Sequence, residues 1–167
     1  MSIETRIPGF EIRTATLDDV PLILSFINGI ATFEGLLQEV SATEDTLRAS
    51  LFGKNPAAHV LFGVYQGTEV SFATYYFTFS SFTGRRGLWL DDLFILPEYR
   101  KMGFGKVILS YIATLARERD CARFEWIVLG WNEKAQRFYE KLGAETLDQW
   151  RINRVSGAAL ERLADEF

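Results

Sequence analysis

The chain has 167 residues, 48% of them apolar and 24% charged, so it can bury one sizeable core but is short for two average domains. Its net charge of −4 provides no global positive field, which argues against nucleic acid or an anionic membrane surface as the main partner. All its apolar runs fall short of the roughly 20 residues that span a bilayer, and residues 1–10 lack the blocks of a secretion signal. We therefore expect a cytoplasmic protein with a single domain over residues 1–167.

Two kinds of chemistry lack their usual residues. The chain contains one histidine, His59, and one cysteine, Cys121. A single histidine excludes most histidine-based zinc sites and triad arrangements, and a single cysteine permits no internal disulfide. We therefore expect no metal site and no serine-hydrolase chemistry.

The first elements alternate between strand and helix patterns. Residues 10–14 alternate like a strand, and the apolar residues that follow recur at helical spacing, which predicts a helix from about Asp18 to Phe33. Ser41 and Glu44 have the form of a capping box, so a short second helix is expected there.

The middle of the chain has the composition of a sheet. Residues 59–65 and 70–80 are rich in β-branched and aromatic side chains and predict a hairpin. Residues 84–87, with two arginines between two glycines, predict a second turn, and residues 88–96 predict a third long strand of the same sheet.

The last third returns to alternation. A glycine-containing loop at residues 100–105 precedes a helical stripe that ends near Arg119, and the apolar run 124–131 predicts a strand buried on both faces. A strand, helix, strand order implies a parallel pair with a right-handed crossover. Asn132 is expected to cap a further helix that stops at Gly143. Residues 149–155 are expected to form a last strand and residues 156–167 a short helix. The expected fold class is α/β.

The loop between the third long strand and the following helix is suited to an anion. Backbone N–H groups and the positive end of a helix dipole converge at such a place. Gly103 and Gly105 remove Cβ atoms where a phosphate must approach, and Arg100, Lys101 and Lys106 add charged donors. A pyrophosphate fits this description. An ordinary strand-to-helix turn with solvated basic residues remains the alternative.

A second group of candidate residues lies on the helix after Asn132. Asn132, Ala135 and Tyr139 are separated by three and four residues, so they share one helical face and can point at one ligand. Asn132 offers an amide, Ala135 lets a chain pass close, and Tyr139 offers a phenol that can donate a proton. The alternative is a capped helix with a packed tyrosine.

The two groups together resemble the GNAT superfamily of N-acetyltransferases. The resemblance rests on LDDLFILPEYRKMGFGKVIL at 90–109, whose R-x-x-G-x-G loop is the superfamily's hallmark, and on WNEKAQRFYEKLGA at 131–144. FEIRTATLDDVPLILSFINGIATFE at 10–34 and ATYYFTF at 73–79 are similar to the diamine (spermidine/spermine) and thialysine acetyltransferase branch. The resemblance implies a mixed sheet of about six to seven strands with helices on both faces, an antiparallel first half and a parallel pair beside the acetyl-CoA site.

The resemblance also implies how acetyl-CoA binds. The pantetheine arm would pair like an extra strand with the backbone of Leu93, Phe94 and Ile95, and Asn132 and Ala135 would border it. Tyr139 would face the thioester sulfur and protonate the departing thiolate. The residues expected around the diphosphate are Arg100, Lys101, Met102, Gly103, Phe104, Gly105 and Lys106.

The acceptor amine needs a group that takes its proton, because an alkylamine of pKa ~10.4 is only about 0.04% neutral at pH 7. Asp91 stands where the branch has a Glu that contacts the acceptor and is thought to accept that proton, directly or through water. Successive strand residues face opposite sides, so Asp92 is expected to point elsewhere, unless a bulge intervenes, and to pair with a basic or backbone group. Phe33 and Glu34 match the segment that lines the acceptor site, which implies a small cationic acceptor.

Two other functions stay open on the sequence alone. The same donor site serves protein N-terminal or lysine acetyltransferases, and a non-catalytic acyl-CoA-binding module can use the same fold. The resemblance further implies a homodimer, with residues 149–155 as a plausible exchange element.

Overall fold

The computed structural model describes residues 2–167, which form two compact units. The first unit runs to Ile127 and the second extends from Val128 to Phe167. Of the helices in residues 2–167, none combines the length and apolar character needed to cross a bilayer. One domain over the whole chain stays a prediction.

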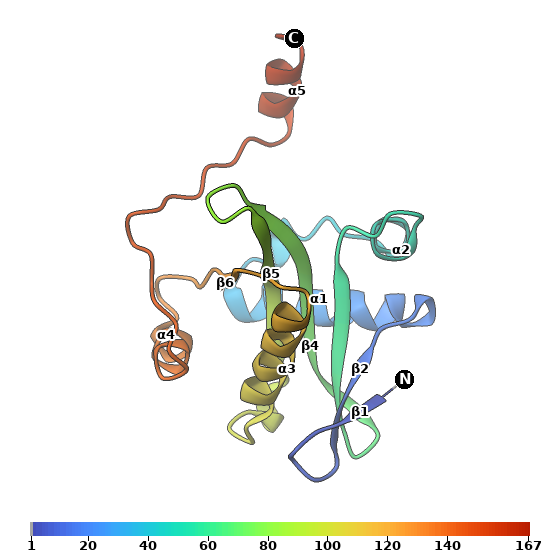
Figure 1. Cartoon of the computed structure of the whole chain (residues 1–167). Helices are drawn as coiled ribbons and strands as arrows, with labels where there is room; N and C mark the ends of the chain where they lie inside the picture. The colour runs from blue at the N-terminus through green and yellow to red at the C-terminus, as the bar shows by residue number, and fades with distance from the viewer. Residues whose placement is uncertain (1) are drawn as a thin grey trace. The chain divides into compact units, whose positions relative to one another are not determined.

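The first unit is built on one mixed sheet (Figure 1). Its described strands are β1 (Ser2–Glu4), β2 (Phe10–Thr14), β3 (His59–Tyr65), β4 (Thr68–Ser80), β5 (Arg85–Ile95) and β6 (Arg123–Trp126). They lie in chain order, and every pair of neighbours is antiparallel except β5 and β6, which are parallel. The predicted antiparallel part and parallel pair are confirmed. The short exposed β1 was not predicted, because three exposed residues show no alternation.

Helices cover both faces of this sheet, as predicted (Figure 1). A 3-10 turn at Leu17–Asp19 leads into α1 (Val20–Glu34), and α2 (Glu44–Phe52) packs beside it against the same core. The other face is covered by α3 (Phe104–Glu118).

Strand alternation sends large aromatic side chains to each face. On the α1 face the ring of Phe26 lies 5.7 Å from Phe62, 5.6 Å from Phe72 and 6.5 Å from Phe94. On the α3 face Phe10 stacks on Phe104 with ring centroids 4.0 Å apart. Burying such side chains stabilises the fold by roughly 1.5–3 kcal/mol each. The sheet is thereby held between its two helical layers.

Two local predictions need correction. The capping box of α2 is Thr43 with Thr46, whose hydroxyl accepts the N–H of Thr43, because the helix begins only at Glu44. The two arginines of residues 84–87 are strand residues, with Arg85 opposite Ser80 and Arg86 opposite Phe79. The chain reverses before them, within residues 81–84, where Gly84 adopts a φ of 63°.

The apolar run at 124–131 is a strand only as far as Trp126, and its strand residues are partly rather than fully buried. The second unit contains α4 (Glu133–Glu140), with Asn132 as its cap, and α5 (Ala158–Ala164), so both predicted helices are confirmed. Residues 149–155 are not a strand. A strand needs a paired neighbour, whereas the backbone N–H of Trp150 donates locally, to the Leu147 carbonyl at 3.1 Å.

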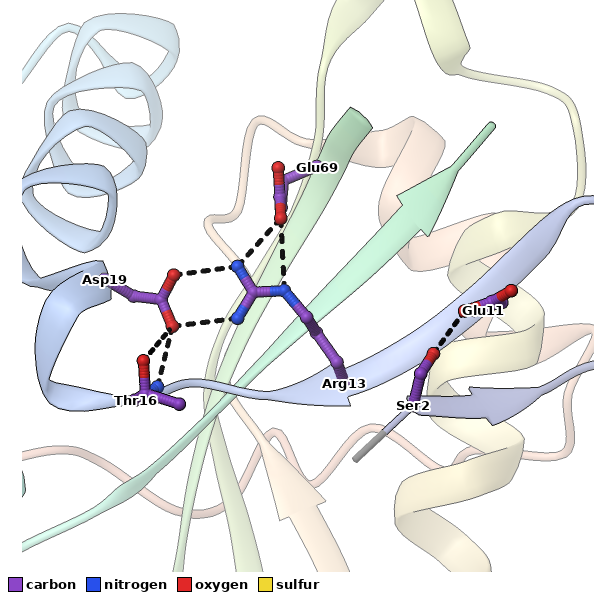
Figure 2. A network of polar contacts seen from close by, with 6 residues as sticks. All are labelled: Ser2, Glu11, Arg13, Thr16, Asp19 and Glu69. Carbon is purple, nitrogen blue, oxygen red and sulfur yellow. Dashed lines mark hydrogen bonds and ion pairs between the residues drawn. The ribbon is translucent and has the colours of Figure 1, made fainter. Parts of the chain in front are cut away.

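An ion-pair network fastens the start of α1 to the sheet (Figure 2). The guanidinium of Arg13 on β2 donates two 2.8 Å bonds to Asp19 and bonds of 3.1 and 2.8 Å to Glu69 on β4. Asp19 also accepts the backbone N–H of Thr16 at 2.7 Å. The hydrogen bond from Arg13 lowers the pKa of Asp19 to about 2. The network therefore orients the helix that ends at Glu34.

We predict that Asp19→Asn lowers the free energy of unfolding by about 1–2 kcal/mol at pH 7, after allowance for solvent screening. The folded-state pKa of Asp19 is depressed from 3.8 to about 2, so its stabilisation is present above pH 4 and disappears as the pH falls toward 2. Urea unfolding at pH 7 and pH 3 measures the difference, with the exposed neighbour Asp18→Asn as control. An equal loss at both pH values would contradict the assignment.

Candidate active site

The sheet opens at one edge of β5. The parallel register ends at Leu90, opposite Trp126, whereas β5 continues to Ile95. Residues 92–95 are therefore paired with β4 on one side and with no described strand on the other. Backbone groups along such an edge can pair with an extended ligand as they would with another strand. Leu93, Phe94 and Ile95, the predicted pantetheine contacts, lie on this open stretch.

A β-bulge at Asp91 marks the point where the sheet opens. Thr74 on β4 is opposite Asp92 and Tyr75 is opposite Leu90, so Asp91 is an extra residue without a cross-strand partner. A bulge changes the direction of the side chain that it carries and increases the local twist. The strict alternation expected for Asp91 and Asp92 therefore does not apply, and the Asp91 residue is exposed.

Asp92 is held by a threonine. The Thr74 hydroxyl donates to Asp92 Oδ2 at 2.7 Å, and the Asp92 N–H donates to Thr74 Oγ1 at 3.1 Å. This pairing replaces the basic or backbone partner that was predicted, and Thr74 itself was not singled out by the sequence. Burial, opposed by the Thr74 hydrogen bond and assisted by the charges of Asp91 and Glu34, raises the pKa of Asp92 to about 6.

Glu34 belongs to the same electrostatic environment. It is the last residue of α1, and burial raises the pKa of its carboxyl group. Its charge acts on Asp92, as does that of Asp91, so Glu34 and Asp91 both lie within electrostatic reach of Asp92. We call Glu34, Asp91 and Asp92 the acidic cluster. Three acids at a sheet opening favour a cation there.

The loop that follows β5 presents a run of unused donors. Lys101 and Gly103 have φ values of 68° and 87°, and α3 begins at Phe104. The backbone N–H groups of residues 101–106 donate to no acceptor within residues 2–167, and the N–H of Val107 is the first to do so, to Gly103 O at 3.2 Å. Lys101 and Lys106 flank these amides, so the predicted anion-binding loop has suitable local geometry.

Arg100 lies at the start of this loop, but its side chain is engaged with the end of β5 and with α1. Its guanidinium lies 4.6 Å from the centre of the Phe33 ring and 5.4 Å from that of Phe94. Its Nε donates to the Ile95 carbonyl at 3.0 Å. These contacts differ from the phosphate contact expected from the sequence.

The second unit contains the other candidate residues on α4. The side chain of Asn132 accepts the N–H of Ala135 at 3.3 Å, which confirms its predicted capping role. Gln136 fastens the loop before the helix by donating to the carbonyls of Leu129 and Gly130 at 3.1 and 2.9 Å, a role that the sequence did not reveal. Burial raises the pKa of Tyr139, so its phenol keeps its proton at neutral pH.

The mixed sheet opens beside a bulge and then leads into a loop whose free amides precede a helix. This arrangement suits an acyl donor that has an extended arm and phosphates. Comparison with known proteins identifies the family. Residues 30–144 match the model of the Acetyltransferase (GNAT) family, and the chain belongs to that family. It is an N-acetyltransferase, as the sequence predicted, and the family uses acetyl-CoA as its acetyl donor.

Relatives and solved structures agree with this assignment. The chain is 38% identical over 164 residues to the thialysine N-epsilon-acetyltransferase of Sus scrofa, across 92% of this chain and 96% of that protein. It is 28% identical to the L-ornithine N5-acetyltransferase of Arabidopsis thaliana, across 91% and 86% of the two chains. An integron cassette protein from V. cholerae shares the fold with a TM-score of 0.76 at 24% identity, across 93% of this chain and 98% of that one. The predicted resemblance to the diamine (spermidine/spermine) and thialysine acetyltransferase branch is confirmed.

We predict that Asp92→Asn stabilises the protein at neutral pH. The folded-state pKa of about 6 exceeds the ordinary 3.8, so the wild-type protein loses stability as the pH rises from about 4 to above 6, and the amide variant does not. The gain should grow from near zero at pH 4 to about 2–3 kcal/mol at pH 7.5. Urea unfolding at the two pH values, with the exposed Glu98→Gln as control, measures it. A gain that does not depend on pH would contradict the buried ionisation.

Proposed function

We propose that the chain transfers an acetyl group from acetyl-CoA, by direct attack, to a primary amine of a small cationic acceptor, either a polyamine or a basic amino acid. The observation that carries this proposal is the arrangement of β5, whose open edge has carboxylates at its bulge and leads into a loop of free amides. The thialysine and L-ornithine named for the relatives are both basic amino acids with a primary amine.

The donor would bind along β5 and the loop. The pantetheine arm would pair with the backbone of residues 93–95, where Phe94 contributes only backbone because its side chain is buried. The diphosphate would accept hydrogen bonds from the amides of residues 101–106, assisted by Lys101 and Lys106. Asn132 and Ala135 would border the arm.

The acceptor would bind through the acidic cluster. An ammonium group is attracted by the cluster, but only the neutral amine can attack the thioester carbonyl. Asp91 would take the proton, and because its side chain is one methylene shorter than that of Glu, a bridging water would be needed more often. The nitrogen forms a bond to the carbonyl carbon, the carbon–sulfur bond breaks, and the thiolate receives the Tyr139 proton. The proton then lost by the acetylated nitrogen restores the Tyr139 phenol through solvent, and Asp91 releases its proton to water. The products are the N-acetylated amine and CoA.

The proposal extends to assembly and location. The alternation of Trp150 and Ile152 is suited to a strand, and residues 149–155 form none within this chain, which supports exchange between two copies in a homodimer. The cytoplasm is the proposed location. Protein N-terminal or lysine acetylation receives less support, because a cluster of three acids suits a small cation that can be surrounded by them.

We predict a preference for cationic acceptors. Purified protein is mixed with acetyl-CoA and with spermidine, lysine, ornithine, thialysine, a neutral amine or an acidic peptide, and thiol release and product mass are recorded. The cationic amines should exceed the neutral amine in kcat/KM by about tenfold or more, as expected when a charged partner is recognised. Glu34→Gln should reduce this ratio. A preference for the neutral or acidic acceptor would contradict the cationic site.

We predict that Tyr139→Phe lowers kcat by about 100-fold at saturating substrates, because positioned proton donors contribute 10²–10⁴-fold. The dissociation constant for acetyl-CoA should change little, since the ring remains. Tyr99→Phe, outside the proposed machinery, serves as the control. Undiminished turnover of the Tyr139 variant would remove this residue from the mechanism.

A further inference from the structure

Among the described residues, no acid pairs with the charge of Arg100. Within residues 2–167 it forms no ion pair with Asp or Glu, and its partners are two aromatic rings and one carbonyl oxygen. A guanidinium over ring faces gains cation–π attraction and packing, typically about 0.5–2 kcal/mol. The side chain therefore has a defined place, and that place is shared between β5 and α1.

The three contacts join two separate parts of the chain. Ile95 and Phe94 are the last residues of β5, and Phe33 is the penultimate residue of α1. The Phe33 and Phe94 rings are themselves 6.3 Å apart, and Gly29 lets Phe94 approach α1, because a Cβ there would lie 3.3 Å from that ring. The Arg100 guanidinium thus covers a junction between the end of the helix and the end of the strand.

Glu34 follows this junction directly. It is the last residue of α1, and Gly35, with a φ of 73°, ends the helix there. Terminal helical turns open more easily than the middle of a helix, because their backbone bonds are incomplete. A contact that holds Phe33 therefore restricts the position of the neighbouring carboxylate.

We propose that Arg100 is a positioning residue for the acceptor side of the site: it holds the Phe33–Glu34 end of α1 against the end of β5. This inference rests on the proposed role of Glu34 in acceptor binding. It assigns Arg100 to the acceptor, whereas the loop in which it stands is assigned to the phosphates of the donor.

The planar shape of the guanidinium is essential to this role. Arg100 acts by stacking on Phe33 and by fixing its Nε on the Ile95 carbonyl, and a lysine reproduces neither. A lysine would, however, keep a positive charge near a bound diphosphate. Arg100→Lys therefore separates a positioning role from a phosphate contact.

The test is calorimetry on the full chain, in two titrations. One titrates acetyl-CoA into the protein, and the other titrates spermidine or lysine into the protein saturated with CoA. Arg100→Lys should weaken acceptor binding about three- to tenfold and leave the acetyl-CoA Kd within about twofold. Lys101→Gln should show the opposite pattern. In turnover, Arg100→Lys should raise the acceptor KM while kcat at saturation stays unchanged.

Phe33→Leu provides a second arm that does not disturb the loop. Alone it should weaken acceptor binding like Arg100→Lys, and the double variant should be no weaker than either single variant, because both act through the same contact. A loss of acetyl-CoA affinity in Arg100→Lys equal to the loss for the acceptor, or multiplicative effects in the double variant, would overturn the proposal. If the wild-type protein binds and acetylates only neutral amines, the proposed function is contradicted instead. The acceptor Kd of the wild-type protein and of Arg100→Lys is then compared with that neutral amine.

Discussion

The site depends on one feature of the sheet: β5 extends beyond its parallel neighbour. Pairing with β6 stops at Leu90, and among the described strands only β4 pairs with residues 92–95 of β5. Backbone groups that a sheet would normally satisfy are thereby left for a ligand. The bulge at Asp91 lies at the same point, so the place where the sheet opens is also the place where a carboxylate changes direction.

Charge is distributed unevenly along this strand and its loop. Asp91 and Asp92 stand at the bulge, where the charge of Glu34 also acts on Asp92, and the free amides with Lys101 and Lys106 stand beyond the end of the strand. Under the proposed function, a donor with an anionic end and an acceptor with a cationic end would be attracted to different places, with the neutral thioester between them. Arg100 is an exception in this division, since it is a cation of the loop whose side chain serves the helix that carries Glu34.

Much of the fold is predictable because it is local. The stripes of α1 and α3, the cap at Asn132 and the β3–β4 hairpin follow from periodicity and turn residues that the sequence displays. The bulge does not, because the register of β4 against β5 depends on contacts between residues about 18 apart, and no local pattern fixes it. The Thr74–Asp92 pair and the place of the Arg100 side chain follow from that register. Residues 149–155 have a strand-like composition but no partner strand among the described residues. Composition alone does not show whether a partner strand is present.

Hydrogen exchange of the backbone amides, with and without acetyl-CoA, tests most directly whether the open edge of β5 and its loop hold the donor. Acetyl-CoA should slow exchange at residues 101–106 and along 93–95, where the amides of the loop and of the open edge become hydrogen-bonded. Protection confined to other parts of the chain, with these amides exchanging as fast as before, would contradict this placement of the donor.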